Sequence, residues 1–360
     1  MIVGVLGGGQ LGRMLALAGI PLGLDVRCME RAADAPAAAV CAVTPGDPAD
    51  AAAVRAFATG LDVLTYEVEG VATDGVPVPL RPPVAALRLT SDRWSEKQLL
   101  AEVGIPTART LPVATRAGLV AAVEQLGACI VKTRTGGYDG RGQVRVTAPG
   151  DLSAAVALLD APGPGLVVEQ LVALDLEVSV VAARGLDGSV AAYPLLENDH
   201  RDGILRVSRL PARLPAGLEA LALGWVTRLL EHLGYVGVLA LELFVSGGEL
   251  LANEVAPRVH NSGHLTVEAC ETGQFEQHLR AVTGLPLGSP APRGPAAMVN
   301  LIGTTPDPAA VLAVPGAHLH LYGKAPRRGR KLGHVTITAP DEAVLEDRLA
   351  LLQRGLAALG

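Results

Sequence analysis

The sequence predicts an α/β protein of two or three domains that begins with a doubly wound parallel sheet. Its 360 residues exceed one ordinary domain. Short apolar runs alternate with helical patterns through roughly the first 85 residues, as in a parallel sheet with connecting helices. Two segments rich in proline and glycine, 76–83 and 286–295, then divide the chain. We therefore expect domain boundaries near residues 90 and 290.

The N-terminal part shows the alternation most clearly. Residues 2–6 form an apolar run that ends in the glycine-rich turn 7–12, and a helical pattern follows at 13–18. The pattern continues with a strand at 25–29, a helix at 50–59 and a strand at 62–65. Strands joined by helices in this way are expected to pair in parallel.

The rest of the chain mixes helices with short strands. The patterns predict helices at 92–103, 119–126, 151–159 and 216–233, and strands at 129–132, 144–146, 166–169 and 177–183. Residues 238–255 predict a hairpin around Ser246, Gly247 and Gly248. A smaller C-terminal module of short strands ends in a helix at 342–359.

Composition narrows the class of protein. A net charge of −6 argues against general nucleic-acid binding. The four cysteines are far apart and form no C-x-x-C pair, so we expect neither a zinc knuckle nor a disulfide framework, and a reducing cytoplasm fits best. No apolar run reaches the ~20 residues of a membrane span. We expect a soluble, cytoplasmic protein with no membrane partner.

Residues 131–143 are the most informative stretch. Lys132 leaves a buried strand and runs into a glycine-rich loop. Glycines let backbone N–H groups approach anionic oxygens closely, and a lysine neutralises charge, so the loop is typical of polyphosphate binding. The alternative is a plain glycine hairpin.

The turn Gly7-x-Gly9-x-x-Gly12 is a weaker signal for an anion site. It matches the dinucleotide fingerprint, with Glu30 near the place of a ribose-binding acid. Every version of this motif places an anion at a helix N-terminus, and a sugar phosphate would use the same device. The alternative is a structural βα turn.

The predicted hairpin brings two carboxylates together. If residues 247–249 form a three-residue loop, Glu242 and Glu254 lie directly opposite on adjacent strands. Such a pair repels itself unless a cation lies between, and Mg²⁺ is the natural occupant beside a triphosphate. Two solvent-facing glutamates are the alternative, but the neighbouring residues at 239–241 and 243 are apolar.

Two further polar segments remain. Residues 254–264 gather side chains able to bind anions just after Glu254. His260 and His264 have helical metal-ligand spacing, but Pro257 and Gly263 argue against a helix there. Residues 324–331 hold five basic residues, which indicate either an anion site or a solvated loop.

These motifs, in their order, resemble the ATP-grasp superfamily and, within it, the carboxyaminoimidazole ribonucleotide synthetases of purine biosynthesis. The runs TGGYDGRGQ at 135–143 and APRVHNSGH at 256–264 carry the resemblance most specifically. The other matching segments span nearly the whole chain: 7–14, 65–69, Asp92 and Arg93 with Lys97 and Gln98, 132–134, Glu169 and Gln170, 234–237, 253–255, 299–303 and 329–334.

The resemblance implies a set of residues for ATP and its metal ion. Arg93 and Lys132 would contact ATP, and a mobile loop would cover its phosphates: Gly137, Tyr138, Asp139, Gly140, Arg141, Gly142 and Gln143. The adenine would be bordered by Glu169, Gln170, Leu171 and Val172, with Glu177 on the ribose and His200 near the nucleotide. Glu242 and Glu254 would hold Mg²⁺ or Mn²⁺. Asn253 would assist, because Ala256 stands where many ATP-grasp enzymes have an asparagine.

The resemblance also implies residues for the second substrate, 5-aminoimidazole ribonucleotide. These are Gln10, Leu11, Glu67, Tyr138, Asp139, Arg141, Arg258, His260, Asn261, Ser262, Lys324, Arg330 and Lys331. Among all these residues, Lys132, Asp139, Arg141 and Arg258 would take part in catalysis.

The fold that the resemblance implies is an ATP-grasp fold with an N-terminal doubly wound domain at 1–90. The ATP-grasp domain would occupy 91–290, with a small lid subdomain at 107–170 and a larger one at 171–290. A C-terminal module at 291–360 would complete the substrate site. A homodimer is expected at the level of the family.

The implied reaction joins bicarbonate to the amine of 5-aminoimidazole ribonucleotide at the expense of ATP, through carboxyphosphate, in de novo purine biosynthesis. One alternative is the formate-dependent glycinamide ribonucleotide transformylase of the same superfamily. A second is an NAD(P)-dependent dehydrogenase, which would explain the turn 7–12 but not Glu242 and Glu254. A third is an inactive nucleotide-binding regulator, which the presence of Lys132 and both glutamates disfavours.

Overall fold

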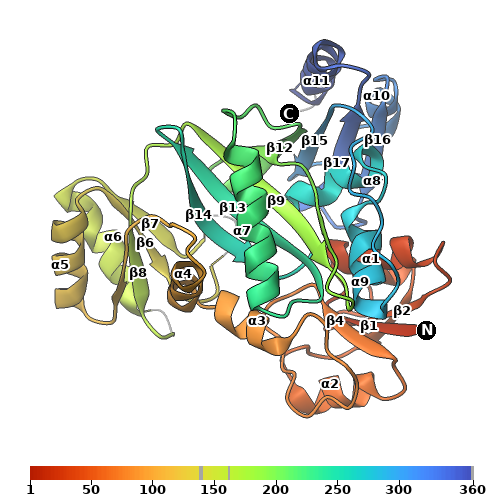
Figure 1. Ribbon diagram of the computed structural model, residues 1–360, viewed down its shortest axis with the longest axis horizontal. Helices are drawn as coiled ribbons and strands as arrows, with labels where there is room; N and C mark the ends of the chain where they lie inside the picture. Colours follow the sequence, from red (N-terminus) through yellow and green to blue (C-terminus); the bar gives the residue numbers. More distant parts are fainter. Residues whose placement is uncertain (138–140, 161–162, 358–360) are drawn as a thin grey trace.

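The computed structural model describes residues 1–137, 141–160 and 163–357. Its strands form three sheets, which lie in a small lobe, a central body and an N-terminal domain beside that body (Figure 1). The predicted α/β class is confirmed. Among the described residues, we find no helix that is both long and apolar enough to cross a membrane.

The N-terminal sheet is parallel throughout, as the alternation predicted, and has the strand order β3-β2-β1-β4. Its strands are β1 (Ile2–Leu6), β2 (Asp25–Glu30), β3 (Ala42–Pro45) and β4 (Val63–Tyr66), joined by α1 (Gln10–Gly19), the short 3₁₀ helix η1 (Pro36–Ala39) and α2 (Ala51–Ala58). The sequence pattern missed β3, because this edge strand is short and mostly exposed and therefore shows no apolar run. The turn 7–12 joins β1 to α1, as predicted.

The small lobe holds the glycine-rich loop. Its antiparallel sheet has the order β5-β8-β6-β7. The elements are β5 (Thr110–Val113), α5 (Arg116–Leu126), β6 (Cys129–Thr133), β7 (Gln143–Val146), η2 (Pro149–Asp151), α6 (Leu152–Ala157), η3 (Leu158–Asp160) and β8 (Leu166–Gln170). Leu119 and Ala155 from the two helices pack with Val131 and Val168 of the sheet. The loop connects β6 to β7, and the predicted site residues Tyr138, Asp139 and Gly140 lie outside the described residues.

The central sheet has nine strands, in the order β14-β13-β9-β11-β12-β15-β17-β16, with β10 paired to β9. They are β9 (Leu176–Arg184), β10 (Val190–Ala192), β11 (Leu196–Arg201), β12 (Ile204–Leu210), β13 (Gly237–Ser246), β14 (Glu249–Ala256), β15 (Ala296–Ile302), β16 (Ala317–Leu321) and β17 (Lys331–Thr338). The remaining helices are α3 (Val84–Thr90), α4 (Arg93–Glu102), α7 (Leu218–His232), η4 (Ser262–Leu265), α8 (Thr266–Ala269), α9 (Gln274–Thr283), α10 (Pro308–Leu312) and α11 (Glu342–Ala357). Because β12 pairs with β15, the C-terminal strands extend the central sheet instead of forming a separate one.

The two faces of the central sheet have different partners. Alternate side chains of β13 point to opposite faces. Leu239 and Leu241 pack with Trp225 of α7, whereas Val238 and Ala240 belong to the core that contains Phe275 of α9. Helix α9 also packs against α1, so it fastens the N-terminal domain to the central sheet. Glu242 continues the face of Val238 and Ala240, which directs it toward the loops between the two domains.

The hairpin β13–β14 pairs Glu242 with Glu254, as predicted, but through a different geometry. The loop has two residues, Gly247 and Gly248, which both have positive φ (57° and 81°) as a tight hairpin turn requires. The expected three-residue loop is therefore wrong. A β-bulge opposite Glu242 and Leu243 adds the extra residue, Asn253, and so restores the predicted pairing.

Candidate functional site

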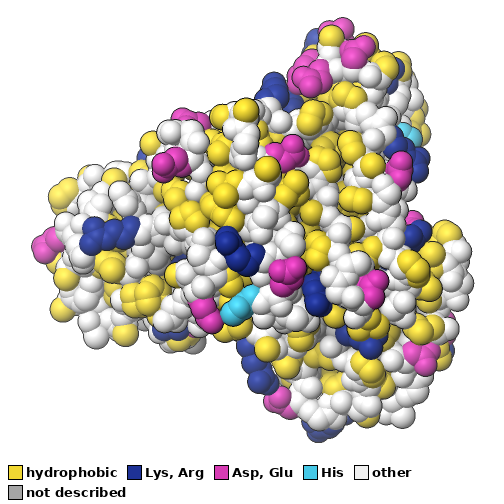
Figure 2. Space-filling view, in the orientation of Figure 1, with side chains coloured by type: hydrophobic (Ala, Val, Ile, Leu, Met, Phe, Trp, Pro, Cys, Tyr) yellow, Lys and Arg dark blue, Asp and Glu magenta, His cyan; other side chains and the backbone are white. Residues whose placement is uncertain are grey.

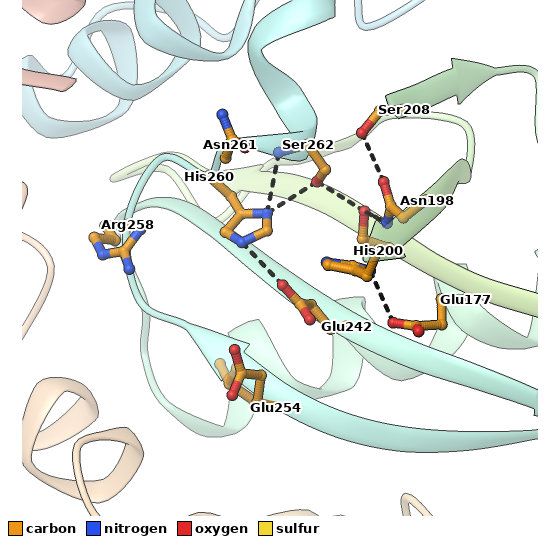
Figure 3. Close-up of polar contacts among 12 residues, drawn as sticks. Glu177, Asn198, His200, Ser208, Glu242, Glu254, Arg258, His260, Asn261 and Ser262 are labelled. Carbon is orange, nitrogen blue, oxygen red and sulfur yellow. Dashed lines mark hydrogen bonds and ion pairs between the residues drawn. The ribbon is translucent and has the colours of Figure 1, made fainter. Parts of the chain in front are cut away.

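The paired carboxylates Glu242 and Glu254 lie on one face of the hairpin and have different partners (Figure 3). Glu242 Oε1 is 2.9 Å from His260 Nε2. Glu254 Oε2 accepts a hydrogen bond from the guanidinium of Arg93 at 3.0 Å. The Arg93 contact connects α4, which precedes the small lobe in the chain, to the edge strand β14.

His260 is held by a chain of buried hydrogen bonds (Figure 3). Its Nδ1 is 2.9 Å from Ser262 Oγ and 3.3 Å from the backbone N of Ser262. The chain continues to three polar side chains of the central sheet, Ser179, Asn198 and Ser208. A backbone N–H pointing at Nδ1 makes this nitrogen the acceptor, so the proton is assigned to Nε2, which donates to Glu242. Burial opposes the charge of Glu242, but His260 outweighs it and lowers the pKa of this carboxyl.

The loop after β14 carries two more of the predicted site residues, Arg258 and Asn261. Arg258 lies 3.1 Å from Glu69 Oε1, which follows β4 of the N-terminal domain. Asn261 and Asn300 exchange hydrogen bonds through their side-chain amides, at 2.6 and 3.1 Å. The loop therefore connects the hairpin with both the N-terminal domain and β15.

The two histidines of this loop do not share a helix. The 3₁₀ helix η4 covers residues 262–265 and begins after His260, which agrees with the expectation that no helix carries both His260 and His264. His264 is fully buried, its Nδ1 lies 3.0 Å from Gln274 Nε2, and burial holds its pKa well below the usual range. Within the described residues, no group of three or more His, Cys, Asp or Glu has a metal-binding arrangement. His264 is therefore a core residue that supports the loop.

The part of the site that was predicted to bind the nucleotide centres on Lys132. Its Nζ lies 2.5 Å from Glu169 Oε2, and both side chains are buried. Burial would raise the pKa of Glu169, but Lys132 and Lys97 outweigh it and lower the pKa to about 2. Glu169 is therefore ionised, and Lys132 has an anionic partner before any phosphate arrives.

The described part of the glycine-rich loop is tied to α4. Arg93 donates to Gly137 O at 3.0 Å. A side chain at Gly137 would place Cβ 2.8 Å from Arg141 O, so glycine is required for this close approach. Gly142 O accepts from Thr133 N at 2.8 Å, and Gln143 pairs with Lys132 at the start of β7. Arg93, Lys132 and the loop thus meet as predicted for a phosphate site.

The residues predicted to bind adenine and ribose lie at the end of β8 and on the strands β9 and β11. Gln170 ends β8, and Leu171 N donates to Ala128 O, so residues 169–172 run along the end of the small lobe. Glu177 and His200 come from the neighbouring strands β9 and β11, and His200 Nδ1 is 2.9 Å from Glu177 Oε2 (Figure 3). Burial opposes a charge on His200, but Glu177 outweighs it and raises the pKa of the ring.

The turn 7–12 already contains a carboxyl group, that of Glu67, whose pKa is raised by burial. Both oxygens of the buried Glu67 carboxylate accept backbone N–H groups, from Gly9 and from Gly12, the latter at 2.7 Å. Gly7, with φ of 105°, leaves room for Glu67, because a Cβ there would lie 2.4 Å from Glu67 Cγ. Glu30 accepts from Gly8 N at 3.1 Å. A dinucleotide would need these same groups, so the turn no longer supports the dehydrogenase alternative.

The first-turn amides of Gln10 and Leu11 remain as donors at this helix N-terminus. Lys324 Nζ donates to Gln10 Oε1, which brings the basic segment against the turn, as the sequence suggested. Arg330 donates to Ala325 O at 3.1 Å, and Lys331 begins β17. Arg327 and Arg328, the other two cations of the segment, are exposed. The segment is therefore anchored at both ends.

The chemistry of the hairpin fits a divalent cation. Glu242 and Glu254 offer hard carboxylate oxygens on one face. Asn253 Oδ1, between them in the bulge, is buried and has no hydrogen-bond partner within the described part of the chain. An amide oxygen left in this way is itself a hard ligand atom, so the residues present fit Mg²⁺.

Sequence reasoning assigned no role to several residues that support the site. Glu96 and Lys97 of α4 are buried and contact β14. Their signal was available, since Glu96 shares a helix face with Leu100 and Val103, which are apolar. Gln274, which binds both N and O of His260, left no comparable signal, because it is a single polar residue far away in the sequence. Asn300 lies in the segment 299–303 that carries the resemblance, but it had been given no role.

Family models match the chain in three consecutive parts. The Ribonucleotide synthetase preATP-grasp domain matches residues 1–80, the ATP-grasp domain 98–275, and the Phosphoribosylaminoimidazole carboxylase C-terminal domain 296–348. This succession, with the loop, lysine and paired carboxylates described above, defines the chain as an ATP-dependent ligase of the ATP-grasp superfamily.

Whole-chain relatives define the family more closely. The N5-carboxyaminoimidazole ribonucleotide synthase of Pseudomonas aeruginosa is 47% identical, over 97% of this chain and 98% of the relative. The crystal structure of the synthetase from Thermus thermophilus is 48% identical, with a TM-score of 0.90 and 98% of each chain covered. The Aspergillus clavatus enzyme, solved with ADP and 5-aminoimidazole ribonucleotide, is 32% identical with a TM-score of 0.90, again covering 98% of each chain. The chain belongs to the family of N5-carboxyaminoimidazole ribonucleotide synthases.

Proposed function

We propose that the chain carboxylates 5-aminoimidazole ribonucleotide with bicarbonate, forming N5-carboxyaminoimidazole ribonucleotide, ADP and phosphate. The observation that carries this proposal is the convergence of two anion sites on one hairpin. Lys132 and the glycine-rich loop lie on its small-lobe side. Arg258, His260 and Asn261 lie on its N-terminal-domain side. A nucleoside triphosphate and a sugar phosphate would therefore meet above Glu242 and Glu254.

The nucleotide would take the groups on the small-lobe side. Lys132 would exchange Glu169 for a phosphate oxygen, and the loop amides would close over the phosphates. Glu177 would accept the ribose hydroxyls, with His200 beside it. Glu242, Glu254 and Asn253 would hold Mg²⁺, or Mn²⁺ in its place. The bound metal ion supplies positive charge that stabilises the transferring phosphoryl group.

The ribonucleotide would take the groups on the other side. Its 5′-phosphate would receive the amides of Gln10 and Leu11 together with Lys324, Arg330 and Lys331. Glu67, already bound below the turn, would set the shape of this pocket and face the ribonucleotide. Arg258 and the residues 260–262 would orient the aminoimidazole.

The reaction would proceed in two steps. Bicarbonate attacks the γ-phosphate and ADP leaves, which gives carboxyphosphate. The substrate amine then attacks the carboxyl carbon, directly or after CO₂ is released within the closed cavity, and phosphate leaves. Arg93, Lys132 and the loop amides would stabilise charge in the first step. Closure of the loop would keep water from the labile intermediate.

The assembly and location of the protein belong to the same proposal. We infer a domain division at 1–90, 91–290 and 291–360, a homodimer, and a cytoplasmic location. Four free thiols support a reducing compartment. On the face drawn in Figure 2, positive and negative side chains are interspersed, which agrees with a small-molecule substrate more than with a nucleic acid. Light scattering of the purified chain tests the dimer.

An assay that omits one component at a time tests the function. ADP formation should require 5-aminoimidazole ribonucleotide, bicarbonate and Mg²⁺, and EDTA should stop it. Glycinamide ribonucleotide with formate tests the transformylase alternative, and NAD(P)H absorbance tests the dehydrogenase. ADP release that is undiminished without the aminoimidazole substrate would overturn the proposal.

A further inference from the structure

Helix α4 holds Glu254 at three points. Lys97 Nζ donates to the backbone O of Asn253, the residue before it. Glu96 Oε1 accepts from the backbone N of Val255, the residue after it, at 2.6 Å. Arg93 binds the Glu254 carboxylate itself at 3.0 Å. These three side chains share one face of the helix, because they are three and four residues apart.

The backbone groups that they bind belong to a sheet edge. Strand β14 is the first strand in the order of the central sheet, and among the described residues its outer edge pairs with other backbone only at one bridge, between Ala252 and Thr107. The bulge also leaves Asn253 outside the pairing with β13. Buried groups of this kind need partners, and Glu96 and Lys97, which are 2% and 5% exposed, supply them. In Figure 1, α4 lies between the small lobe and this edge of the central sheet.

Lys97 also reaches the nucleotide side of the site. Its Nζ lies 3.6 Å from Glu169 Oε1, while Lys132 binds the other oxygen of the same carboxylate at 2.5 Å. When Lys132 turns to a phosphate, Glu169 becomes a buried carboxylate that has lost its nearer cation. A buried charge without a partner is costly. Lys97 keeps Glu169 compensated and so lowers the cost of releasing Lys132.

We propose that Glu96 and Lys97 are positioning residues of the metal and nucleotide site, which fix Glu254 through the peptide groups on either side of it. Lys97 has the second role of counter-ion to Glu169 during ATP binding. This inference rests on the proposed function of Glu254 and Lys132. It goes beyond that function, since neither Glu96 nor Lys97 contacts a substrate in this scheme.

Two pairs of variants separate positioning from general stability. Lys97→Met removes the donor and its charge, whereas Lys97→Arg keeps both. Glu96→Leu removes the acceptor for Val255 N, whereas Glu96→Gln keeps an acceptor of the same length. Each variant is first melted thermally, and three constants are then measured. These are Mn²⁺ affinity of the ADP complex by electron paramagnetic resonance, KM for ATP and KM for 5-aminoimidazole ribonucleotide.

We expect Lys97→Met to weaken Mn²⁺ binding and raise KM for ATP about tenfold or more, the effect of losing one charge-assisted hydrogen bond. KM for the ribonucleotide should stay within about threefold, and Lys97→Arg should restore most of both losses. Glu96→Leu should weaken Mn²⁺ binding while Glu96→Gln retains it. If Lys97→Met does not fold, the Glu96 pair carries the test.

Three results would overturn the inference. The first is a folded Lys97→Met with Mn²⁺ affinity and KM for ATP like those of the wild type. The second is Lys97→Arg as impaired as Lys97→Met. The third is an equal loss in all three constants that follows the melting temperature, since this describes a purely structural residue. Failure of the proposed function is a separate outcome, in which the wild type shows no ribonucleotide-dependent ADP formation. The comparison of Mn²⁺ affinities among the variants would still test the roles of Glu96 and Lys97.

Discussion

Lys132 and Glu169 form a buried ion pair on neighbouring strands of the small lobe, with Nζ 2.5 Å from Oε2. Lys132 therefore has a carboxylate as its partner, and under the proposed function it exchanges this carboxylate for a phosphate oxygen when ATP binds. Such an exchange costs less because one anion replaces another beside Lys132 and because Lys97 remains near Glu169.

The first prediction follows from this pair. Lys132→Met should lower kcat/KM by about 100-fold or more, since a preorganised charge partner of the transferring phosphate is removed. Steady-state kinetics with coupled ADP detection measures it. Arg145→Met, on the exposed side of the neighbouring strand β7, is the matched control and should behave like the wild type. A tenfold or smaller loss for Lys132→Met would mean that the ATP site is misplaced.

The second prediction concerns the hairpin carboxylates. Glu254→Gln should also lower activity by about 100-fold or more, because a neutral amide holds a divalent cation poorly. Glu249→Gln changes an exposed carboxylate at the tip of the same hairpin and should have little effect. Activity titrated against Mg²⁺ separates weak metal binding from other defects. A Glu254→Gln enzyme with normal activity at low Mg²⁺ would remove Glu254 from the metal site.

The third prediction tests the basic segment. Arg330→Ala combined with Lys331→Ala should raise KM for 5-aminoimidazole ribonucleotide strongly, since each lost charge-assisted hydrogen bond is worth about 1.5–3 kcal/mol. KM for ATP should stay within about threefold. The double variant Arg327→Ala with Arg328→Ala, from the exposed middle of the segment, is the control. If ATP binding weakens instead, the segment belongs to the nucleotide.

The fourth prediction concerns stability and pH. His278 is buried on α9 between Val238 N, which donates to Nδ1 at 3.1 Å, and Thr65 Oγ1, 2.8 Å from Nε2. Burial lowers its pKa from 6.5 to about 4. The unfolded chain therefore binds this proton more readily. The stability that neutral His278 contributes is present above pH 6.5 and is lost as the pH falls through the folded pKa.

As the pH falls from 6.5 to about 4, protonation of His278 should reduce the free energy of unfolding by up to about 1.4 kcal/mol per pH unit. Urea unfolding between pH 7 and pH 4 gives the free energy of unfolding of the wild type and of His278→Asn. Subtracting the two curves removes most of the contribution of the carboxylates, which both proteins share. The variant should have the shallower slope. His318→Asn, on an exposed histidine, should keep the wild-type slope. Equal slopes in wild type and His278→Asn would refute the assignment.

Much of the fold could be predicted, because apolar runs reveal buried strands. The strands β1, β2 and β4 and the helices α1, α2, α4 and α7 follow such patterns. Strand β11, by contrast, consists of Leu196, Glu197, Asn198, Asp199, His200 and Arg201, which reads as a loop. His200 and Asn198 of this strand contact the proposed site, and polar side chains of this kind conceal the periodicity that identifies strands.

The site itself was predictable to the extent that its residues lie in compact motifs. Arg93 connects the glycine-rich loop, at Gly137, with Glu254, which pairs with Glu242 as the sequence indicated. The bulge at Asn253 was not visible, because no residue type there requires it, and the two-residue loop had to be seen before the bulge could be inferred. The occupation of the turn 7–12 by Glu67 depends on a contact across 55 residues, which local patterns do not contain.

The central claim is that bicarbonate attacks ATP to form carboxyphosphate, and an oxygen-isotope experiment tests it most directly. The enzyme is supplied with bicarbonate labelled with ¹⁸O, ATP, Mg²⁺ and 5-aminoimidazole ribonucleotide, and the phosphate is analysed by mass spectrometry at short times. The account predicts one bicarbonate oxygen in each phosphate, because the bridging oxygen of carboxyphosphate leaves with phosphorus when the amine attacks carbon. Phosphate that carries oxygen from water instead would contradict the account.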